Sequence, residues 1–259
     1  MQKKVYFYNS RKEKLCGILF RPKGPGKVPG IVFCHGFASS KGSKISIARK
    51  ICKNGFAVLI FDASGHGESG GKFEDHTITK YVGEVKNAVE FLKNQKFVDS
   101  KRIGITGTSL GGMVSVIYAS KHKPKAIISV CAPTALTKFI GNESLMQKNF
   151  IEEWKKKGFA TFAVRIKEDK RAPRILSYNF MKDGMKYNLA KTVKKVRCPI
   201  IIVHGNADKN VLLDHAYILF RNANMPKEMV IIEGAAHTFK GEYENILAKI
   251  IINGFKKFL

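Results

Sequence analysis

The chain has 259 residues, of which 44% are hydrophobic and 25% are charged. This balance is typical of one large globular domain and excludes a disordered or fibrous protein. The formal net charge is +26 at pH 7, but 37 lysines greatly outnumber 9 arginines and are scattered along the chain. Because arginine is the residue favoured for bidentate contacts with phosphates and bases, we expect a solvated lysine-rich surface and no nucleic-acid partner.

The composition also bears on the cellular compartment. No apolar run approaches the ~20 residues that a transmembrane helix needs, and the polar residues 9–12 come too early for a signal peptide. The five cysteines lie far apart, without a C-x-x-C pair or a zinc-site spacing. Such cysteines are typical of buried, reduced thiols. We therefore expect a cytoplasmic protein without membrane attachment, and we leave open whether it forms a homo-oligomer.

Apolar strand-like segments alternate with amphipathic helices along the chain, the pattern of an α/β protein with a mostly parallel sheet. Two strands separated by a polar turn at residues 9–11 come first, and six buried strands follow. The helix predicted over residues 78–92 has apolar residues at three- and four-residue spacing. We predict one domain over residues 1–259. Its eight predicted strands are residues 4–8, 15–20, 30–34, 57–61, 102–106, 126–130, 199–203 and 229–232.

One interval between predicted strands is too long for a simple crossover. From Cys131 to Cys198 there are 68 residues, whereas a βαβ unit takes ~30 residues. The surplus follows the C-terminal end of a strand, the edge where open α/β sheets bind ligands. We predict a cap insertion over residues 134–190, with Trp154 and Phe162 as candidate substrate-binding residues. The alternative is a small subdomain in which these aromatic residues only pack against one another.

The strongest chemical signal is the Gly-Thr-Ser-Leu-Gly segment at residues 107–111, a G-x-S-x-G sequence between a predicted strand and a predicted helix. The residues that flank a nucleophile on this sharp turn must be small. Ser109 is the candidate nucleophile, at a helix N-terminus whose free N–H groups stabilise negative charge. The candidate oxyanion-hole donors are the amides of Leu110 and of Phe37, which follows the third strand. A chance match in a glycine-rich chain is the alternative.

A serine nucleophile needs a base to take its proton, and the base needs an acid to orient it. Asp208 lies just beyond the strand at residues 199–203 and fits the acid. Its rival, Asp214, falls where a helix begins, a common structural position for a carboxylate. His237 follows the last strand and fits the base. The predicted triad is Ser109, Asp208 and His237, in the chain order expected for this turn.

Other polar residues near strand ends are predicted to be structural. His35 is expected to tie its loop together by hydrogen bonds, and the polar residues of 62–70 to stabilise a turn after the fourth strand. His76 and His215 are expected at the surface or at helix starts. The sequence contains no phosphate loop, dinucleotide fingerprint or metal-ligand cluster. We therefore expect no cofactor and no metal ion.

With these motifs assembled, the chain resembles the α/β-hydrolase superfamily. Within it, the chain is similar to small carboxylesterases of the feruloyl/cinnamoyl-esterase and serine-aminopeptidase-like group. The resemblance implies an eight-stranded, mostly parallel sheet with helices on both faces, a cap between the sixth and seventh strands, and a serine esterase without a cofactor. It runs from about Tyr6 to the C-terminus and rests on His35-Gly36-Phe37, Asp62 with Gly65-His66-Gly67-Glu68-Ser69, residues 107–112, His204-Gly205 with Asp208, and His237.

The expected reaction is hydrolysis of small-molecule carboxylic esters through an acyl-enzyme. The short insertion favours short- to medium-chain or aromatic acyl groups over long-chain triglycerides. A serine aminopeptidase would use the same triad, but it needs carboxylates for the substrate amine, and residues 134–197 carry 16 Lys/Arg against 6 Asp/Glu. A non-catalytic binding protein of this fold is the other alternative, although such proteins tend to lose a triad member.

Overall fold

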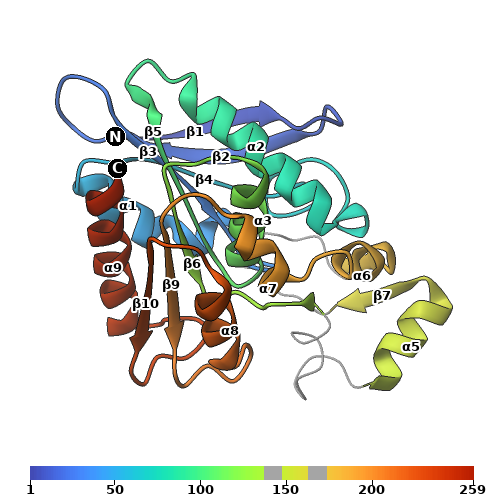
Figure 1. Cartoon of the computed structure of the whole chain (residues 1–259). Coiled ribbons are helices and arrows are strands. Elements are labelled where there is room, and N and C mark those ends of the chain that lie inside the picture. The colour runs from blue at the N-terminus through green and yellow to red at the C-terminus, as the bar shows by residue number, and fades with distance from the viewer. Residues whose placement is uncertain (137–147, 163–173) are drawn as a thin grey trace.

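A computed structural model of the chain describes residues 1–136, 148–162 and 174–259 (Figure 1). The strands of the central sheet are β1 (Gln2–Tyr8), β2 (Lys14–Phe20), β3 (Val28–Cys34), β4 (Ala57–Phe61), β5 (Val98–Thr108), β6 (Ala126–Val130), β9 (Ile200–Gly205) and β10 (Lys227–Ile232). They are ordered β1-β2-β4-β3-β5-β6-β9-β10. β1–β2 and β2–β4 are antiparallel and the other neighbours are parallel. The predicted eight-stranded, mostly parallel sheet is confirmed.

Helices cover both faces of this sheet (Figure 1). α1 (Ile45–Lys53) and α9 (Glu242–Phe258) lie on one face, and α2 (Ile78–Lys93), α3 (Leu110–Lys121) and α8 (Asp214–Asn222) on the other. The 3-10 helices η1 (Lys41–Lys44) and η2 (Phe73–Asp75) precede α1 and α2.

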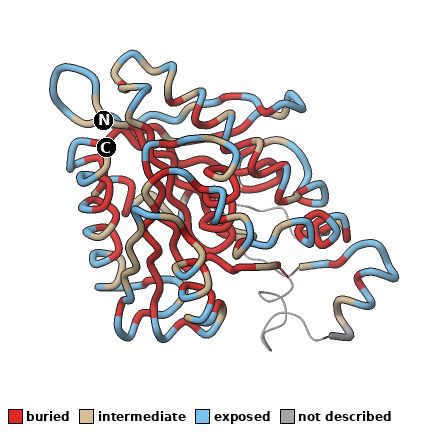
Figure 2. The backbone as a smooth tube through the Cα atoms, in the orientation of Figure 1, coloured by how far each residue is buried: buried red, intermediate tan, exposed pale blue. Residues whose placement is uncertain are grey.

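The inner strands are apolar on both sides because helices cover both faces of the sheet. Along β3, Ile31 and Phe33 join the hydrophobic core under α1 and α9, whereas Val32 and Cys34 join the core under α2 and α3. Alternate residues of a strand point to opposite faces, so a strand with two apolar faces is stable only between two layers. Figure 2 shows buried residues along the central strands and exposed residues on the outer sides of the helices. No helix in the described ranges is long and apolar enough to cross a bilayer.

The interval between β6 and β9 holds a separate group of elements, where the cap was predicted. Its described part contains α5 (Lys148–Lys157), β7 (Phe159–Phe162), β8 (Arg174–Ser177), α6 (Asn179–Gly184), α7 (Leu189–Thr192) and η3 (Val193–Lys195). β7 and β8 pair antiparallel in a small sheet of their own. α5 and β7 project beyond the edge of the main body (Figure 1). The bounds 134–190 stay a prediction.

The turn after β4 has the structural role expected of it, with one added partner. The Asp62 carboxylate is fully buried and accepts hydrogen bonds from the Lys41 Nζ at 2.5 Å and the Glu68 amide at 2.9 Å. Ser69 donates its hydroxyl to the Asp62 carbonyl at 2.6 Å. These bonds connect the turn to η1, so Asp62 holds two loops at the carboxyl edge of the sheet.

Of the two expected positions for His76 and His215, surface or helix start, the structure has the second, because both stand next to helix starts. Both are buried, with 1% and 6% of their surface exposed. The His76 ring stacks on Phe180 of α6, with 5.7 Å between centroids. His215 Nδ1 lies 2.8 Å from the hydroxyl of Thr134. Segments inserted between β6 and β9 cover these positions, and their burial therefore depends on tertiary packing.

Candidate active site

Ser109 occupies the sharp turn between β5 and α3. Its backbone has φ 57° and ψ −121°, a combination unfavourable for residues with a side chain and found mainly at functional turns. A Cβ atom on Gly107 would lie 2.3 Å from the carbonyl oxygen of Gly111, and one on Gly111 would lie 2.3 Å from that of Cys34. Both distances are far below van der Waals contact. The strand and helix can therefore approach only because small residues flank Ser109.

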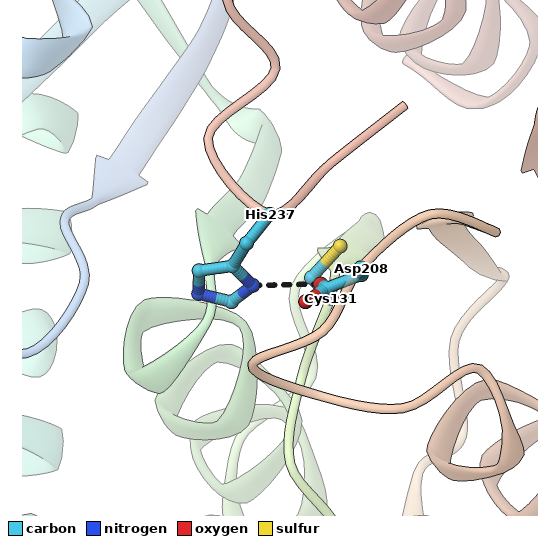
Figure 3. Close-up of side chains that lie close together, drawn as sticks. All are labelled: Cys131, Asp208 and His237. Carbon is cyan, nitrogen blue, oxygen red and sulfur yellow. Dashed lines mark hydrogen bonds and ion pairs between the residues drawn. The ribbon is translucent and has the colours of Figure 1, made fainter. Parts of the chain in front are cut away.

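Asp208 and His237 lie together beyond the ends of β9 and β10 (Figure 3). His237 Nδ1 lies 2.7 Å from Asp208 Oδ2. Because a carboxylate only accepts, Nδ1 carries the proton and Nε2 of the neutral ring remains an acceptor. The other carboxylate oxygen accepts the amides of Asn210 at 2.8 Å and Val211 at 2.9 Å. Asp208 thus orients the ring with its basic nitrogen free.

The electrostatics of Asp208 favour the ionised form. Burial of its carboxyl opposes ionisation, but the His204 and His237 rings and the Val211 amide outweigh it and hold the pKa of Asp208 well below its usual range. The rival acid, Asp214, begins α8 and is exposed to solvent, as expected for a carboxylate at a helix start. The geometry therefore favours Asp208 over Asp214 as the partner of His237.

Ser109 and His237 line the same pocket, which has a volume of about 490 Å³. The pocket is bounded by the start of α1, the start of α9 and the loop that follows β10. Besides Ser109 and His237, its wall includes Phe37, Ser43, Lys44, Asn210, Lys240 and Glu244. The structure therefore brings the predicted nucleophile and base to one cavity, with Asp208 buried behind the base.

Of the two predicted oxyanion-hole residues, Leu110 directly follows Ser109 in the chain, and Phe37 lines the same pocket as Ser109. Leu110 is the first residue of α3, so its N–H has no acceptor within the helix. Phe37 lies in the loop after β3 and lines the pocket. His35 holds this loop in place, because its Nε2 accepts the Ala63 amide at 3.0 Å and its Nδ1 donates to the Gly36 carbonyl at 2.7 Å. The structural role expected of His35 is confirmed.

Trp154 and Phe162 do not line this pocket in the described part of the chain. Trp154 is 1% exposed, and its indole N–H donates to the Leu176 carbonyl at 2.9 Å. Phe162 is half-buried between Trp154 and Phe37, with ring centroids 5.6 and 5.7 Å away. Trp154 thus fits the alternative in which the aromatic residues pack together, and Phe162 contacts Phe37, which is part of the pocket wall. Their substrate-binding role stays a prediction.

Sequence reasoning missed a thiol beside the candidate acid and base. Cys131 directly follows β6 with φ 47°, and it is 1% exposed. Its Sγ, a carboxylate oxygen of Asp208 and a ring nitrogen of His237 all lie within 4.8 Å of one another (Figure 3). Burial, together with the Asp208 charge, raises the pKa of this thiol well above its usual value. No pattern in the sequence marks Cys131, because only the fold brings it beside Asp208.

Among the residues that the structure describes, two groups of side chains have the atom types of metal ligands, and the members of both already bind one another or a lysine. The first group is Cys131, Asp208 and His237. In it the His237 ring is hydrogen-bonded to the Asp208 carboxylate, and the Cys131 thiol is protonated. In the second group, Cys16, Asp62 and Glu68, the Lys41 ammonium contacts both carboxylates, at 2.5 and 2.7 Å. A cation would have to displace these protons or this ammonium, so the arrangements fit an orienting pair and an ion-pair network better than metal centres.

Comparisons with known proteins identify the family of this chain. Residues 28–244 match the model of the family described as serine aminopeptidase, S33. The human mitochondrial palmitoyl-protein thioesterase ABHD10 is 31% identical over 189 residues, which are 71% of this chain and 58% of that protein. The chain thus spans less than two thirds of that relative. An uncharacterized 31.7 kDa protein of Escherichia coli is 24% identical over 275 residues, covering 92% of this chain and 94% of that protein.

Solved structures share the fold over almost the whole chain. Est1E from Butyrivibrio proteoclasticus with bound ferulic acid has a TM-score of 0.82 at 23% identity, covering 98% of both chains. Mouse α/β hydrolase domain-containing protein 10 has a TM-score of 0.76 at 23% identity, covering 99% of this chain and 100% of that one. Together with the family match over residues 28–244, the sharp turn at Ser109 and the sheet order, these findings show that the chain belongs to the serine aminopeptidase S33 family of α/β-hydrolases.

Proposed function

We propose that the protein is a serine esterase that hydrolyses carboxylic esters of small molecules. The single observation that carries this proposal is the pocket that holds both Ser109 and His237, with His237 Nδ1 hydrogen-bonded to the buried Asp208 carboxylate at 2.7 Å. A hydroxyl, a ring with a free basic nitrogen and an orienting carboxylate are the three parts of covalent serine catalysis.

In the proposed mechanism, Ser109 Oγ attacks the ester carbonyl carbon while His237 Nε2 takes the hydroxyl proton. The amides of Leu110 and Phe37 stabilise the oxyanion of the tetrahedral intermediate. His237 then gives its proton to the alcohol oxygen as the ester C–O bond breaks, which leaves an acyl-Ser109. Water attacks this acyl group while His237 takes its proton, and His237 then returns the proton to Ser109 Oγ as the acyl C–O bond breaks and the acid is released. Asp208 stabilises the positively charged ring in both steps.

The size of the pocket supports small substrates. Its volume of about 490 Å³ lies within the ~300–1,000 Å³ of typical small-molecule sites. We infer that short- to medium-chain or aromatic acyl esters are cleaved faster than long-chain triglycerides.

Peptide hydrolysis at free N-termini is less well supported, although the family is described as serine aminopeptidase. Such a substrate needs a carboxylate for its ammonium group. Glu244 lines the pocket, but its Oε1 already accepts hydrogen bonds from Ser46 and Lys50. The pocket also contains Lys44 and Lys240, which would repel an ammonium group.

Thioester hydrolysis is a second candidate, because the human relative at 31% identity is described as a palmitoyl-protein thioesterase. The same nucleophile, base and oxyanion hole serve both reactions, which differ only in whether oxygen or sulfur leaves. A matched pair of butyrate substrates, one a p-nitrophenyl ester and one a thioester, would rank the two by kcat/KM.

Substitution of the nucleophile is the primary test. Ser109→Ala should lower kcat on p-nitrophenyl butyrate by about 10⁴-fold or more, because it removes the attacking group. A fluorophosphonate probe should label wild type at Ser109 and leave the variant unlabelled. Ser120→Ala, a serine of the same helix whose hydroxyl bonds to the Ile117 carbonyl, is the control and should keep both properties. Near-normal turnover by a folded Ser109→Ala protein would refute the proposal.

A further inference from the structure

The pocket contains a partly buried lysine, Lys44, for which the described part of the chain offers no ion pair within 4 Å. Lys44 is half-buried and lines the cavity that contains Ser109 and His237. Its Nζ lies 5.6 Å from the ring centroid of Phe33, a buried residue of β3. Among the residues that the structure describes, Lys44 donates no hydrogen bond and forms no ion pair within 4 Å. Ammonium groups withdrawn from water are normally paired, because desolvation of the charge is costly.

The neighbouring charges leave this ammonium only partly compensated. Glu244 also lines the pocket, but its carboxylate accepts the Ser46 hydroxyl at 2.5 Å and the Lys50 Nζ at 2.8 Å. Burial lowers the pKa of Lys44 to about 8, although Glu244 and Cys131 act in the opposite direction. The group is therefore still largely protonated at neutral pH. Lys240, which is exposed, adds a second positive charge to the wall.

Lys44 lies where η1 passes directly into α1, and Ile47 of the first turn of α1 lines the pocket as well. The amide of Ile45 donates to the Gly42 carbonyl, so the backbone at this junction is already hydrogen-bonded. The first turn of α1 has no acidic residue. The positive charge at this end of the cavity therefore comes from the Lys44 side chain.

The position of His237 indicates which part of a bound ester would lie near Lys44. His237 and the residues that follow it, up to Lys240, form one wall of the pocket. In ester hydrolysis the base must later protonate the departing alcohol oxygen, so the alcohol leaves on the side of the base. The alcohol part of the substrate therefore lies between His237 and the start of α1, where Lys44 is found.

We propose that Lys44 binds a carboxylate on the alcohol part of the substrate, so that the preferred substrates are esters of hydroxy acids. This inference rests on the proposed ester hydrolysis. Lys44 would then determine specificity, through an ion pair that a neutral alcohol cannot make. Asn210, a half-buried residue of the same wall, offers a side-chain amide as a second donor.

The test compares two esters that differ in one charge, 4-acetoxybenzoate and its methyl ester. Wild type should have a higher kcat/KM for the anion, mainly through a lower KM. Lys44→Met removes the charge and keeps the side-chain length, and it should lower the anion-to-neutral ratio of kcat/KM by at least about tenfold. Assays at about 0.5 M NaCl suppress long-range attraction by the other lysines. Lys53→Met, an exposed lysine at the other end of α1, is the matched control and should leave the ratio unchanged.

A binding measurement separates this inference from the proposed function. Calorimetric titration with 4-hydroxybenzoate should show binding to wild type and to Lys53→Met, and at least about tenfold weaker binding to Lys44→Met. If neither ester is hydrolysed, ester hydrolysis is refuted while the titration still decides the anion site. An equal ratio of kcat/KM in wild type and Lys44→Met, or equal binding of 4-hydroxybenzoate, would overturn the role of Lys44.

Discussion

At the scale of single residues, the site combines a strained nucleophile with a rigid acid. Ser109 has φ 57°, which costs of order 1–3 kcal/mol for a residue with a side chain. Asp208 is fixed by two backbone amides, at 2.8 and 2.9 Å, and by the His237 ring. Two features hold the turn in this strained conformation. The Ser109 amide donates a hydrogen bond to the Val130 carbonyl at 2.8 Å, and Gly107 and Gly111 pack closely on either side. Both residues are therefore preorganised before a substrate arrives.

The assignment of the acid can be tested by substitution. We expect Asp208→Asn to lower kcat on p-nitrophenyl butyrate by about 10³-fold or more, because an amide no longer stabilises the positively charged His237 ring or selects its tautomer. Asp214→Asn, at the exposed start of α8, should change kcat less than about twofold. Steady-state kinetics of both variants, with circular dichroism to verify folding, would decide. A larger loss in Asp214→Asn would show that the acid is misassigned.

At the scale of elements, the cap is connected to the active site by aromatic rings that contact one another edge to face or at a tilt. Trp154 of α5 packs against Phe162 of β7, which contacts Phe37, and Phe37 lines the pocket. Phe37 also contacts Phe180 of α6, with 5.2 Å between ring centroids. The cap therefore supports the loop that supplies one proposed oxyanion-hole amide. A change in the cap would shift this loop through Phe37 rather than through direct contact with the pocket.

This chain of rings predicts how the cap affects acyl preference. We expect Phe162→Ala to change the ratio of kcat/KM between p-nitrophenyl hexanoate and p-nitrophenyl acetate by about threefold or more, because Phe37 loses a neighbour. The acetate reaction itself should change little. Ile175→Ala, an exposed residue of the paired strand β8, serves as control. Identical acyl profiles in the three proteins would mean that Phe162 does not shape the acyl site.

Over the whole molecule, the dominant property is the net charge of +26. A positively charged protein attracts anionic substrates and so raises their encounter rate and their concentration near its surface. Salt screens this attraction over a Debye length of ~10 Å at 0.1 M. The pocket wall is also positively charged, because in the described part of the chain it contains Lys44 and Lys240 but one acidic residue, Glu244.

Salt dependence therefore distinguishes charged from neutral esters. We expect kcat/KM of wild type for 4-acetoxybenzoate to fall severalfold when NaCl is raised from about 20 to about 300 mM. The methyl ester should change much less, because it has no charge to attract. Initial rates at subsaturating substrate measure this directly. The same salt response for both esters would show that the surface charge does not guide substrates to the site.

Short-range patterns in the sequence determined much of this fold. Apolar runs located all eight strands of the central sheet. The inner strands are buried on both faces and therefore need apolar residues along most of their length. The sharp turn at Ser109 could be recognised because the close contact of β5 and α3 admits only glycine at residues 107 and 111. The elements of the cap were not predicted individually, because the pattern of its short helices and strands depends on what they pack against.

The tertiary structure alone decided which distant residues share a surface. Trp154 proved to be buried in the cap, and His76 and His215 are covered by segments inserted between β6 and β9. Lys44 and Cys131 have no distinguishing motif, yet the fold places one in the pocket and the other beside Asp208. The spacing of apolar residues indicates which face of a helix or strand is buried. It does not indicate which loops become neighbours, because that depends on the order of the strands and on the path of each crossover connection.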